Sequence, residues 1–229
     1  MDDELQRVRT AIADVPGWLS RKEAETLYSL AKACTGRGAI VEIGSWRGRS
    51  TICLALGATA GAGPRVYSID RHTDGTFPDF TRNLEAAGVA GVVTPIRSKS
   101  LDAVDGFTEP IELLFIDASH LYEEVREDVE RWEPKLLEGG VLALHDTTFF
   151  EGPKRVAEEL VFRSRRFKDV HLVVSSTTVA TKVAANSAAD RLRNRAALAW
   201  KLAFEAAART RRFLPRPVVQ AARKALGAR

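Results

Sequence analysis

The sequence is poor in cysteine and lacks any long apolar segment. Its two cysteines, Cys34 and Cys53, lie in apolar helical contexts and form no C-x-x-C pair, so we expect two buried thiols in a reducing compartment. The acidic start of the chain has no apolar core of the kind that a signal peptide needs, and no apolar segment approaches the roughly 20 residues that span a bilayer. These absences predict a cytoplasmic protein without a disulfide framework.

Positive charge is concentrated at the C-terminal end of the sequence. The formal net charge is +4, but residues 190–229 contain eleven Lys/Arg and two Asp/Glu and therefore carry +9, which leaves −5 for residues 1–189. The basic character thus belongs to the end of the chain. An acidic body argues against a nucleic-acid groove that runs across it.

Short apolar segments alternate with amphipathic ones before this basic region. We predict strands at 39–43, 65–69, 92–96, 112–116, 140–144, 170–174 and 179–183. We predict helices at 4–13, 20–33, 50–60, 77–87, 123–137 and 153–163, with a short helical turn near 101–104. Five strands that alternate with helices imply an α/β fold with a parallel sheet covered on both faces. The last two strands are too close together for a crossover, so they must form an antiparallel hairpin.

The basic region is predicted to be a separate helical extension. We therefore divide the chain into a domain at 1–185 and an extension at 186–229. A helix at 190–212 places one set of apolar residues on a single face: Leu192, Ala196, Ala199, Trp200, Ala203, Phe204 and Ala207. Two prolines, Pro215 and Pro217, end it, and a short basic helix is expected to follow. Such a helix can pack on the body, form a dimer contact, or bind an anionic membrane surface.

A glycine-containing turn follows the first predicted strand. A dinucleotide fingerprint needs three glycines at a spacing that Gly44 and Gly48 do not provide, and a P-loop needs a longer spacer and a lysine where Arg49 stands. The third interpretation is the first motif of methyltransferases, in which an acidic residue precedes the glycine turn. Glu42 stands two residues before Gly44, so we favour this interpretation.

Polar residues that could contact an adenosine follow the second and third strands. Asp70 stands at the tip of the second strand, 26 residues after Gly44, where a carboxylate can accept hydrogen bonds from both ribose hydroxyls. Ser98 and Ser100 follow the third strand, on the expected adenine side. The alternatives are a helix cap or surface carboxylate for Asp70, and an ordinary polar loop for the serines.

Four ionisable side chains follow the fourth and fifth strands: Asp117, His120, His145 and Asp146. Each alone could be a helix cap or a polar rim residue, but the cluster at neighbouring strand tips favours a functional site. The two aspartates suit Mg²⁺, while a nitrogen ligand from His145 would favour Mn²⁺ or Zn²⁺. The sequence contains no G-x-S-x-G motif, which argues against a serine hydrolase.

Together these motifs resemble the class I S-adenosylmethionine-dependent O-methyltransferases of the macrocin and sugar O-methyltransferase type, methyltransferase family 24. The resemblance extends over roughly residues 35–185, and segments 42–51, 115–120 and 138–146 carry it. It implies a Rossmann-like seven-stranded methyltransferase sheet with a C-terminal antiparallel hairpin, and S-adenosylmethionine as methyl donor. The Ala/Arg-rich composition also resembles actinobacterial sugar O-methyltransferases of methylated-polysaccharide pathways.

The resemblance also suggests roles for the site residues. The residues expected to hold the cofactor are Glu42, Gly44, Ser45, Asp70, Ser98, Ser100 and Asp117. It implies a divalent metal, Mg²⁺ or Mn²⁺, at Asp117 and Asp146, and His120 as the general base. His145 stands where metal-dependent relatives often carry an acidic or amide residue, which makes it a third metal ligand or a rival base.

The expected reaction is transfer of a methyl group to a hydroxyl of a small molecule, with a saccharide as the acceptor. A catechol or phenol is the alternative acceptor, and a ligand-binding or membrane-docking module without activity is the alternative function. A nucleic-acid methyltransferase usually carries an Asn/Asp-Pro-Pro-aromatic segment after the fourth strand, which residues 117–120 lack, so we expect no nucleic-acid partner. Segment 71–80 and the N-terminal helices are expected to shape the acceptor pocket, and Trp18 and Trp46 could stack on a ring.

Overall fold

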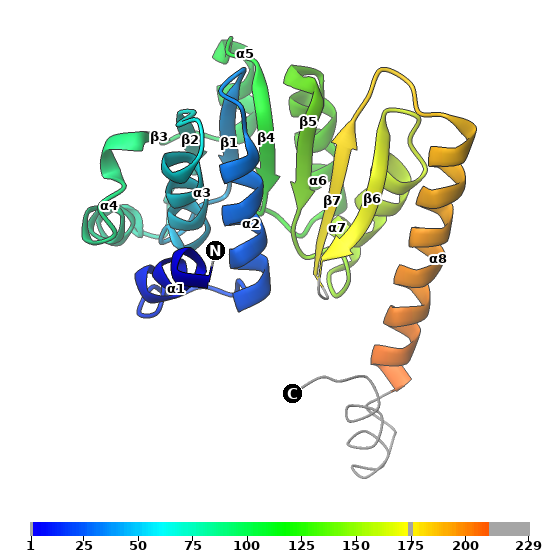
Figure 1. Cartoon of the computed structure of the whole chain (residues 1–229), viewed down its shortest axis with the longest axis horizontal. Helices are drawn as coiled ribbons and strands as arrows, with labels where there is room; N and C mark the ends of the chain where they lie inside the picture. The colour runs from blue at the N-terminus through cyan, green and yellow to red at the C-terminus, as the bar shows by residue number, and fades with distance from the viewer. Residues whose placement is uncertain (1, 174–175, 211–229) are drawn as a thin grey trace.

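A computed structural model describes residues 2–173 and 176–210, which form one seven-stranded sheet flanked by helices (Figure 1). The order of the strands across the sheet is β3-β2-β1-β4-β5-β7-β6. The strands are β1 (Ala39–Ile43), β2 (Val66–Ile69), β3 (Val93–Ile96), β4 (Ile111–Ile116), β5 (Leu136–Leu144), β6 (Phe167–Val173) and β7 (Thr177–Lys182). Strands β1 to β5 pair in parallel, while β7 pairs antiparallel with both β5 and β6. The predicted Rossmann-like sheet with an antiparallel edge is therefore confirmed.

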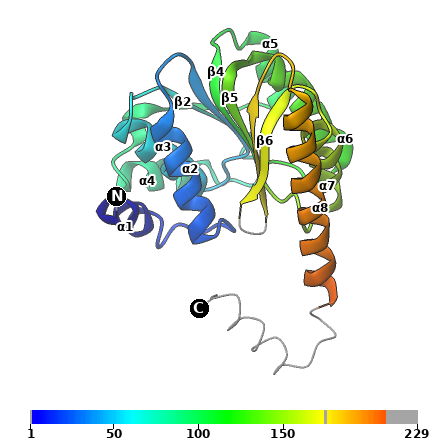
Figure 2. The ribbon, with the colours of Figure 1, turned by 45° about the vertical axis from the view of Figure 1, so that its right-hand side comes forward.

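Helices cover both faces of this sheet. They are α1 (Asp2–Ala11), α2 (Arg21–Ala33), α3 (Arg49–Ala60), α4 (Phe77–Ala86), α5 (Ser100–Gly106), α6 (Tyr122–Trp132), α7 (Glu151–Val156) and α8 (Ala188–Thr210). Residues of α1 to α4 pack into one buried cluster, and residues of α5 to α8 pack into a second cluster on the opposite face. Figure 2 shows the two helical layers with the sheet between them. The central strands β1 and β4 are buried along their whole length, which explains why every residue in them except Glu42 and Glu112 is apolar.

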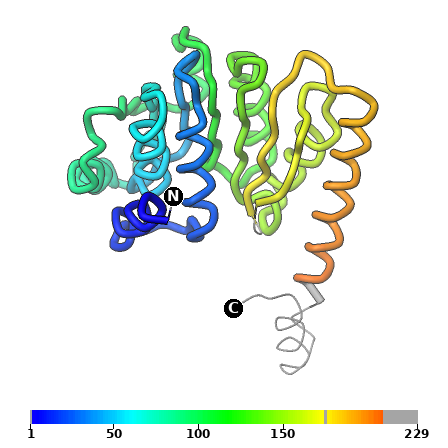
Figure 3. Tube along the Cα trace, in the orientation of Figure 1, coloured from blue at the N-terminus to red at the C-terminus, as the bar shows by residue number. Residues whose placement is uncertain are grey.

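The path of the chain through the last strands sets the shape of the antiparallel edge. After β5 the chain passes through α7 and the π-helical turn η3 (Ala157–Phe162), forms β6 at the outer edge, and returns as β7 between β5 and β6 (Figure 3). Residue 174, the last of the predicted strand 170–174, and residue 175, the first of the predicted connection, lie outside the described part of the chain.

One predicted helix is shorter than the sequence suggested. The prediction extended it to residue 137, but α6 ends at Trp132 and a 3₁₀ turn, η2 (Glu133–Lys135), follows. Pro134 explains the end, because proline lacks the N–H group that would continue the helix. Strand β5 consequently begins at Leu136, four residues before the predicted start.

Helix α8 packs on the sheet edge with a mainly polar stripe. Its residues Asn194 and Lys201 are completely buried: Asn194 donates to the carbonyl of Phe167 over 2.9 Å, and the Lys201 ammonium pairs with Glu158 and Glu205. The predicted apolar face does not pack on the sheet: Leu192 and Trp200 are 71% and 72% exposed. Figure 1 shows the last turns of α8 extending beyond the sheet. The short basic helix predicted after Pro217 lies outside the described residues.

Over residues 2–173 and 176–210, no helix combines the length and the apolar character that crossing a membrane would require.

Candidate active site

The residues singled out in the sequence converge on one cavity at the carboxyl edge of the parallel strands. The cavity has a volume of about 1170 Å³, and its wall includes Gly44, Asp70, segment 98–101, segment 117–120 and segment 145–146. Ligands of open α/β sheets bind at this edge, because the loops that follow parallel strands all emerge there. The predicted cofactor, base and metal residues therefore share one space, with the exception of Glu42.

The Gly44 turn brings the tips of β1 and β4 into contact. Gly44 has a left-handed backbone, with φ at +86°, and a Cβ at this position would overlap the carbonyl oxygen of Asp117 and lie 2.7 Å from Cα of Ala118. The N–H group of Asp117 donates to the carbonyl of Ile43 over 2.8 Å. Only glycine satisfies both the backbone angle and the close approach.

Glu42 lies behind the wall of the cavity. Its side chain is completely buried, and its Oε2 accepts hydrogen bonds from the hydroxyls of Thr51 and Ser68. Burial raises the pKa of Glu42 to about 7. The residue thus ties β1 to α3 and β2 below the Gly44 turn.

Asp70 receives three backbone hydrogen bonds at the tip of β2. Its Oδ2 accepts from the N–H groups of Ser45 and Trp46, both over 2.9 Å, and its Oδ1 accepts from the N–H group of His72 over 2.7 Å. A carboxylate offers about four acceptor sites, so Asp70 retains one, on Oδ1, that can accept from a ribose hydroxyl while the other three fix the turn. Its partly exposed side chain lines the cavity, as do Ser98 and Ser100.

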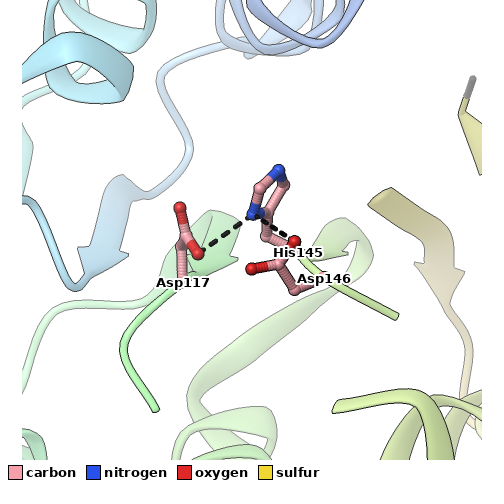
Figure 4. A group of neighbouring side chains, drawn as sticks. All are labelled: Asp117, His145 and Asp146. Atoms are coloured by element: carbon pink, nitrogen blue, oxygen red, sulfur yellow. Dashed lines mark hydrogen bonds and ion pairs between the residues drawn. The ribbon is translucent and has the colours of Figure 1, made fainter. Parts of the chain in front are cut away.

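Asp117, His145 and Asp146 form one cluster at the tips of β4 and β5 (Figure 4). Each can offer one ligand atom, and these atoms lie within 4.8 Å of one another. Nδ1 of His145 lies 3.0 Å from Oδ1 of Asp117 and 3.5 Å from Oδ1 of Asp146. Two carboxylates and an imidazole nitrogen at this spacing suit a divalent cation, so the donor set fits the predicted metal.

His145 is surrounded by carboxylates on both sides of its ring. It is 4% exposed, and its Nε2 lies 3.4 Å from Oε1 of Glu23, a residue of α2. Burial alone would lower the pKa of an imidazole, but the contacts with Asp117, Asp146 and Glu23 outweigh it and raise the pKa of His145 to about 12. Because both of its ring nitrogens face carboxylates, His145 is poorly suited to accept a proton from an acceptor hydroxyl.

His120 has a different environment. Its side chain is 47% exposed and lines the cavity, and its Nε2 lies 2.8 Å from Oδ2 of Asp146. Its ring stacks on Phe150 with the ring centres 3.8 Å apart. The stacking and the contact with Asp146 orient an accessible imidazole at the mouth of the cavity.

Several cavity residues were not identified from the sequence. Glu23 forms a capping box with Ser20 at the start of α2, and its other oxygen lies 3.4 Å from Nε2 of His145. Ser176, beside β7, donates to Oδ1 of Asp146 over 3.0 Å. No local pattern indicates these contacts, because each joins segments far apart in the chain.

Two tryptophans line the cavity, Trp18 and Trp46. Their ring centres lie 4.9 Å apart with the ring planes tilted by 31°, and Trp18 is 83% exposed. Nearby, Arg49 donates to the carbonyls of Ile12 and Val15. The residue that stands in place of a P-loop lysine therefore anchors the N-terminal segment instead of facing a phosphate.

Comparisons with known proteins agree with this geometry. Residues 41–147, just under half of the chain, match the family model described as "Methyltransferase domain". This segment contains the Gly44 turn, Asp70 and the tips of β4 and β5, so the matched residues supply much of the cavity wall. A protein of Sinorhizobium fredii described as "Uncharacterized protein y4gI" is 25% identical over 119 residues, which make up 47% of this chain but only 13% of that protein.

Solved structures share the fold over most of the chain. Cofactor-bound Rv0187 from MTB is 22% identical, with a TM-score of 0.60 over 79% of this chain and 88% of that one. The O-methyltransferase TomG of Streptomyces achromogenes, involved in tomaymycin synthesis and solved with SAM, is 22% identical, with a TM-score of 0.60 over 80% and 91% of the two chains. An O-methyltransferase of Bacillus cereus solved with SAH gives the same identity and TM-score over 80% and 92%. The fold of this chain is therefore that of known O-methyltransferases.

Replacing Gly44 should cost more stability than a left-handed glycine normally does. Gly88 is the matched control, because its φ is +69° and no described atom lies within 4 Å of a Cβ placed there. We expect Gly88→Ala to lower the free energy of unfolding by about 1–2 kcal/mol, and Gly44→Ala to lower it by roughly 2 kcal/mol more because of the overlap with Asp117. Urea denaturation of both variants measures the difference, and equal losses would show that the close approach is unimportant.

The buried Glu42 carboxyl should make stability depend on pH. Its folded-state pKa of about 7 exceeds the ordinary value of 4.5, so between these values the folded chain binds the proton more tightly than the unfolded chain. The stabilisation is therefore complete below about pH 4.5 and is lost as the pH rises through 7. Relative to Glu42→Gln, the wild type should lose on the order of 2–3 kcal/mol between pH 5 and pH 8. Urea denaturation at both pH values gives this double difference, and parallel curves for the two proteins would contradict it.

Proposed function

We propose that this chain transfers the methyl group of S-adenosylmethionine to a hydroxyl of a small-molecule acceptor, and that the acceptor is a saccharide. The observation that carries the proposal is the convergence of the Gly44 turn, Asp70 and the cluster of His120, Asp117 and Asp146 on one cavity. Methyl transfer from S-adenosylmethionine needs three elements close together. They are a turn that binds the cofactor, a group that accepts hydrogen bonds from its ribose hydroxyls, and a base that takes the proton of the acceptor hydroxyl. The match to a methyltransferase domain supports the same conclusion.

The cofactor would lie along the wall formed by the first three strand tips. The turn at Gly44 and Ser45 allows close approach of the backbone, and α3 begins four residues later with its N-terminus directed toward the same edge. Asp70 would accept from the ribose, and Ser98 and Ser100 would border the adenine. Asp117, at the tip of β4, would face the methionine part of the cofactor.

His120 is the general base in this proposal. Methyl transfer forms a bond from the acceptor oxygen to the methyl carbon and breaks the carbon–sulfur bond, whose electron pair stays on a neutral thioether sulfur. The hydroxyl proton must leave, and His120 can take it on Nδ1 while its Nε2–H donates to Asp146. His145, whose nitrogens both face carboxylates, would hold Asp117 and Asp146 in place rather than take the proton.

A divalent cation, Mg²⁺ or Mn²⁺, would be held by Asp117 and Asp146, with Nδ1 of His145 as a third donor in its neutral form. When bound, such an ion supplies a positive charge that lowers the pKa of the acceptor hydroxyl. The side chains of the protein orient the acceptor and receive its proton.

The rim of the cavity favours an acceptor with a flat, partly apolar face. Trp18 is 83% exposed, and Phe149 and Phe150 are 62% and 42% exposed on the cavity wall. Aromatic rings of this kind stack on the apolar face of a sugar and also on a catechol or phenol. The rim therefore supports a ring-shaped acceptor, and the assay must separate the two classes.

The proposed activity is tested by following conversion of S-adenosylmethionine to S-adenosylhomocysteine with a panel of saccharides, catechols and phenols. Each acceptor is assayed with Mg²⁺, with Mn²⁺ and with EDTA. We expect turnover with a saccharide, its suppression by EDTA and its recovery on adding either ion. Turnover with phenols alone would overturn the acceptor class, full turnover in EDTA would remove the metal, and no binding of the cofactor would overturn the function.

Removing the imidazole of His120 should slow methyl transfer without weakening cofactor binding. We expect His120→Ala to bind S-adenosylmethionine with unchanged affinity but to lose about 10²-fold or more in kcat, because the general base is gone. His171→Ala is the matched control, since His171 lies on β6 in an exposed position and is not part of the cavity wall. Calorimetry and turnover assays measure the two effects, and normal turnover by His120→Ala would disprove this role.

A further inference from the structure

Asp128 is a buried carboxylate on the cavity wall whose role neither the fold nor the proposed chemistry explains. It lies on α6, is only 5% exposed, and lines the cavity. The hydroxyl of Ser100, in the first turn of α5, donates to its Oδ1. The carboxylate thus reaches the end of the cavity that segment 98–101 forms.

Asp128 has no positively charged partner among the residues that the structure describes. Within the described part of the chain it forms no ion pair, and the neighbouring charges on α6, Glu124 and Glu127, repel it. Burial raises its pKa to about 6. A buried carboxylate with a single hydroxyl donor is costly, so one that is kept beside a cavity suits a ligand that brings a further donor.

The geometry of the cavity indicates which part of the cofactor reaches this end. If the ribose lies at Asp70 and the reactive methyl group faces His120, the base must extend the other way, toward Ser98, Ser100 and Asp128. Adenine carries one hydrogen-bond donor group on its ring system, the exocyclic amino group, and its ring nitrogens are acceptors. A carboxylate, which only accepts, is complementary to that amino group and to no other polar position on the free edge of the base.

Resting on the function proposed above, we propose that Asp128 is a specificity-determining residue that accepts a hydrogen bond from the adenine amino group. Ser100 fixes the orientation of the carboxylate by donating to its other oxygen. Recognition of the base is then assigned to helix α6, and recognition of the ribose to the tip of β2.

The test removes each partner of the hydrogen bond in turn. Binding of S-adenosylhomocysteine is compared with binding of its analogue in which hydrogen replaces the 6-amino group, for the full-length wild type and for Asp128→Ala. Loss of a hydrogen bond to a charged group should make the wild type prefer S-adenosylhomocysteine by about tenfold or more. In Asp128→Ala the two ligands should bind with affinities within about twofold of each other, because the partner of the amino group is gone.

Glu127→Ala is the control variant, since Glu127 is the adjacent acidic residue, is exposed and also borders the cavity. It should keep the wild-type preference. If Asp128→Ala does not fold, Asp128→Asn carries the test, and its preference should fall at least about threefold because the charge is removed while the shape is kept.

The outcomes separate this inference from the proposed function. An unchanged preference in the Asp128 variants, or a wild type that does not distinguish the two ligands, would overturn the role of Asp128 even though the cofactor binds. Failure of the wild type to bind S-adenosylhomocysteine at all would overturn the proposed function itself. A merely structural link between α5 and α6 would lower the affinity for both ligands equally and leave the preference intact.

Discussion

The carbonyl of Asp117 occupies the space that a side chain at position 44 would need, and the cavity depends on this close approach. It lets the turn after β1 fold over the tip of β4, so that the Gly44 turn and Asp117 both line the cavity. Asp70 then fixes the turn from the other side by accepting from Ser45 and Trp46. If β1 and β4 lay further apart, the Gly44 turn and the Asp117 carboxylate would no longer line the same cavity.

The close approach of the strand tips also crowds charged side chains together. Three carboxylates, those of Glu23, Asp117 and Asp146, lie around the single imidazole of His145, so the cluster remains negative even when that ring is charged. Under the proposed function, a negative cluster attracts a sulfonium donor and attracts the neutral thioether product less. Binding of substrate and release of product are then both favoured by fixed charges.

The fold and most of the site could be predicted because both depend on local patterns. Apolar segments that alternate with helices require a parallel sheet, and the residues after such strands must meet at one edge; for this reason Asp117 and Asp146 could be placed together from the sequence. Glu23 could not, because its capping-box pattern accounts for only one of its two oxygens. The orientation of α8 was also unpredictable, since its polar residues rather than its apolar face are buried: Asn194 donates to Phe167 on the sheet edge, and Lys201 pairs with Glu158 of η3 and with Glu205 of α8 itself.

One contact has a consequence for how the site is assembled during synthesis. Thr177 of β7 donates to Glu23 of α2 over 2.9 Å, so the environment of His145 is completed by residues that are 154 positions apart. Strand β7 must also insert between β5 and β6 before this contact can form. A nascent chain that has emerged only as far as β5 can already place Asp117 beside Asp146, yet it lacks the partner that holds Glu23 against the ring. The surroundings of His145 are therefore complete only when β7 has joined the sheet.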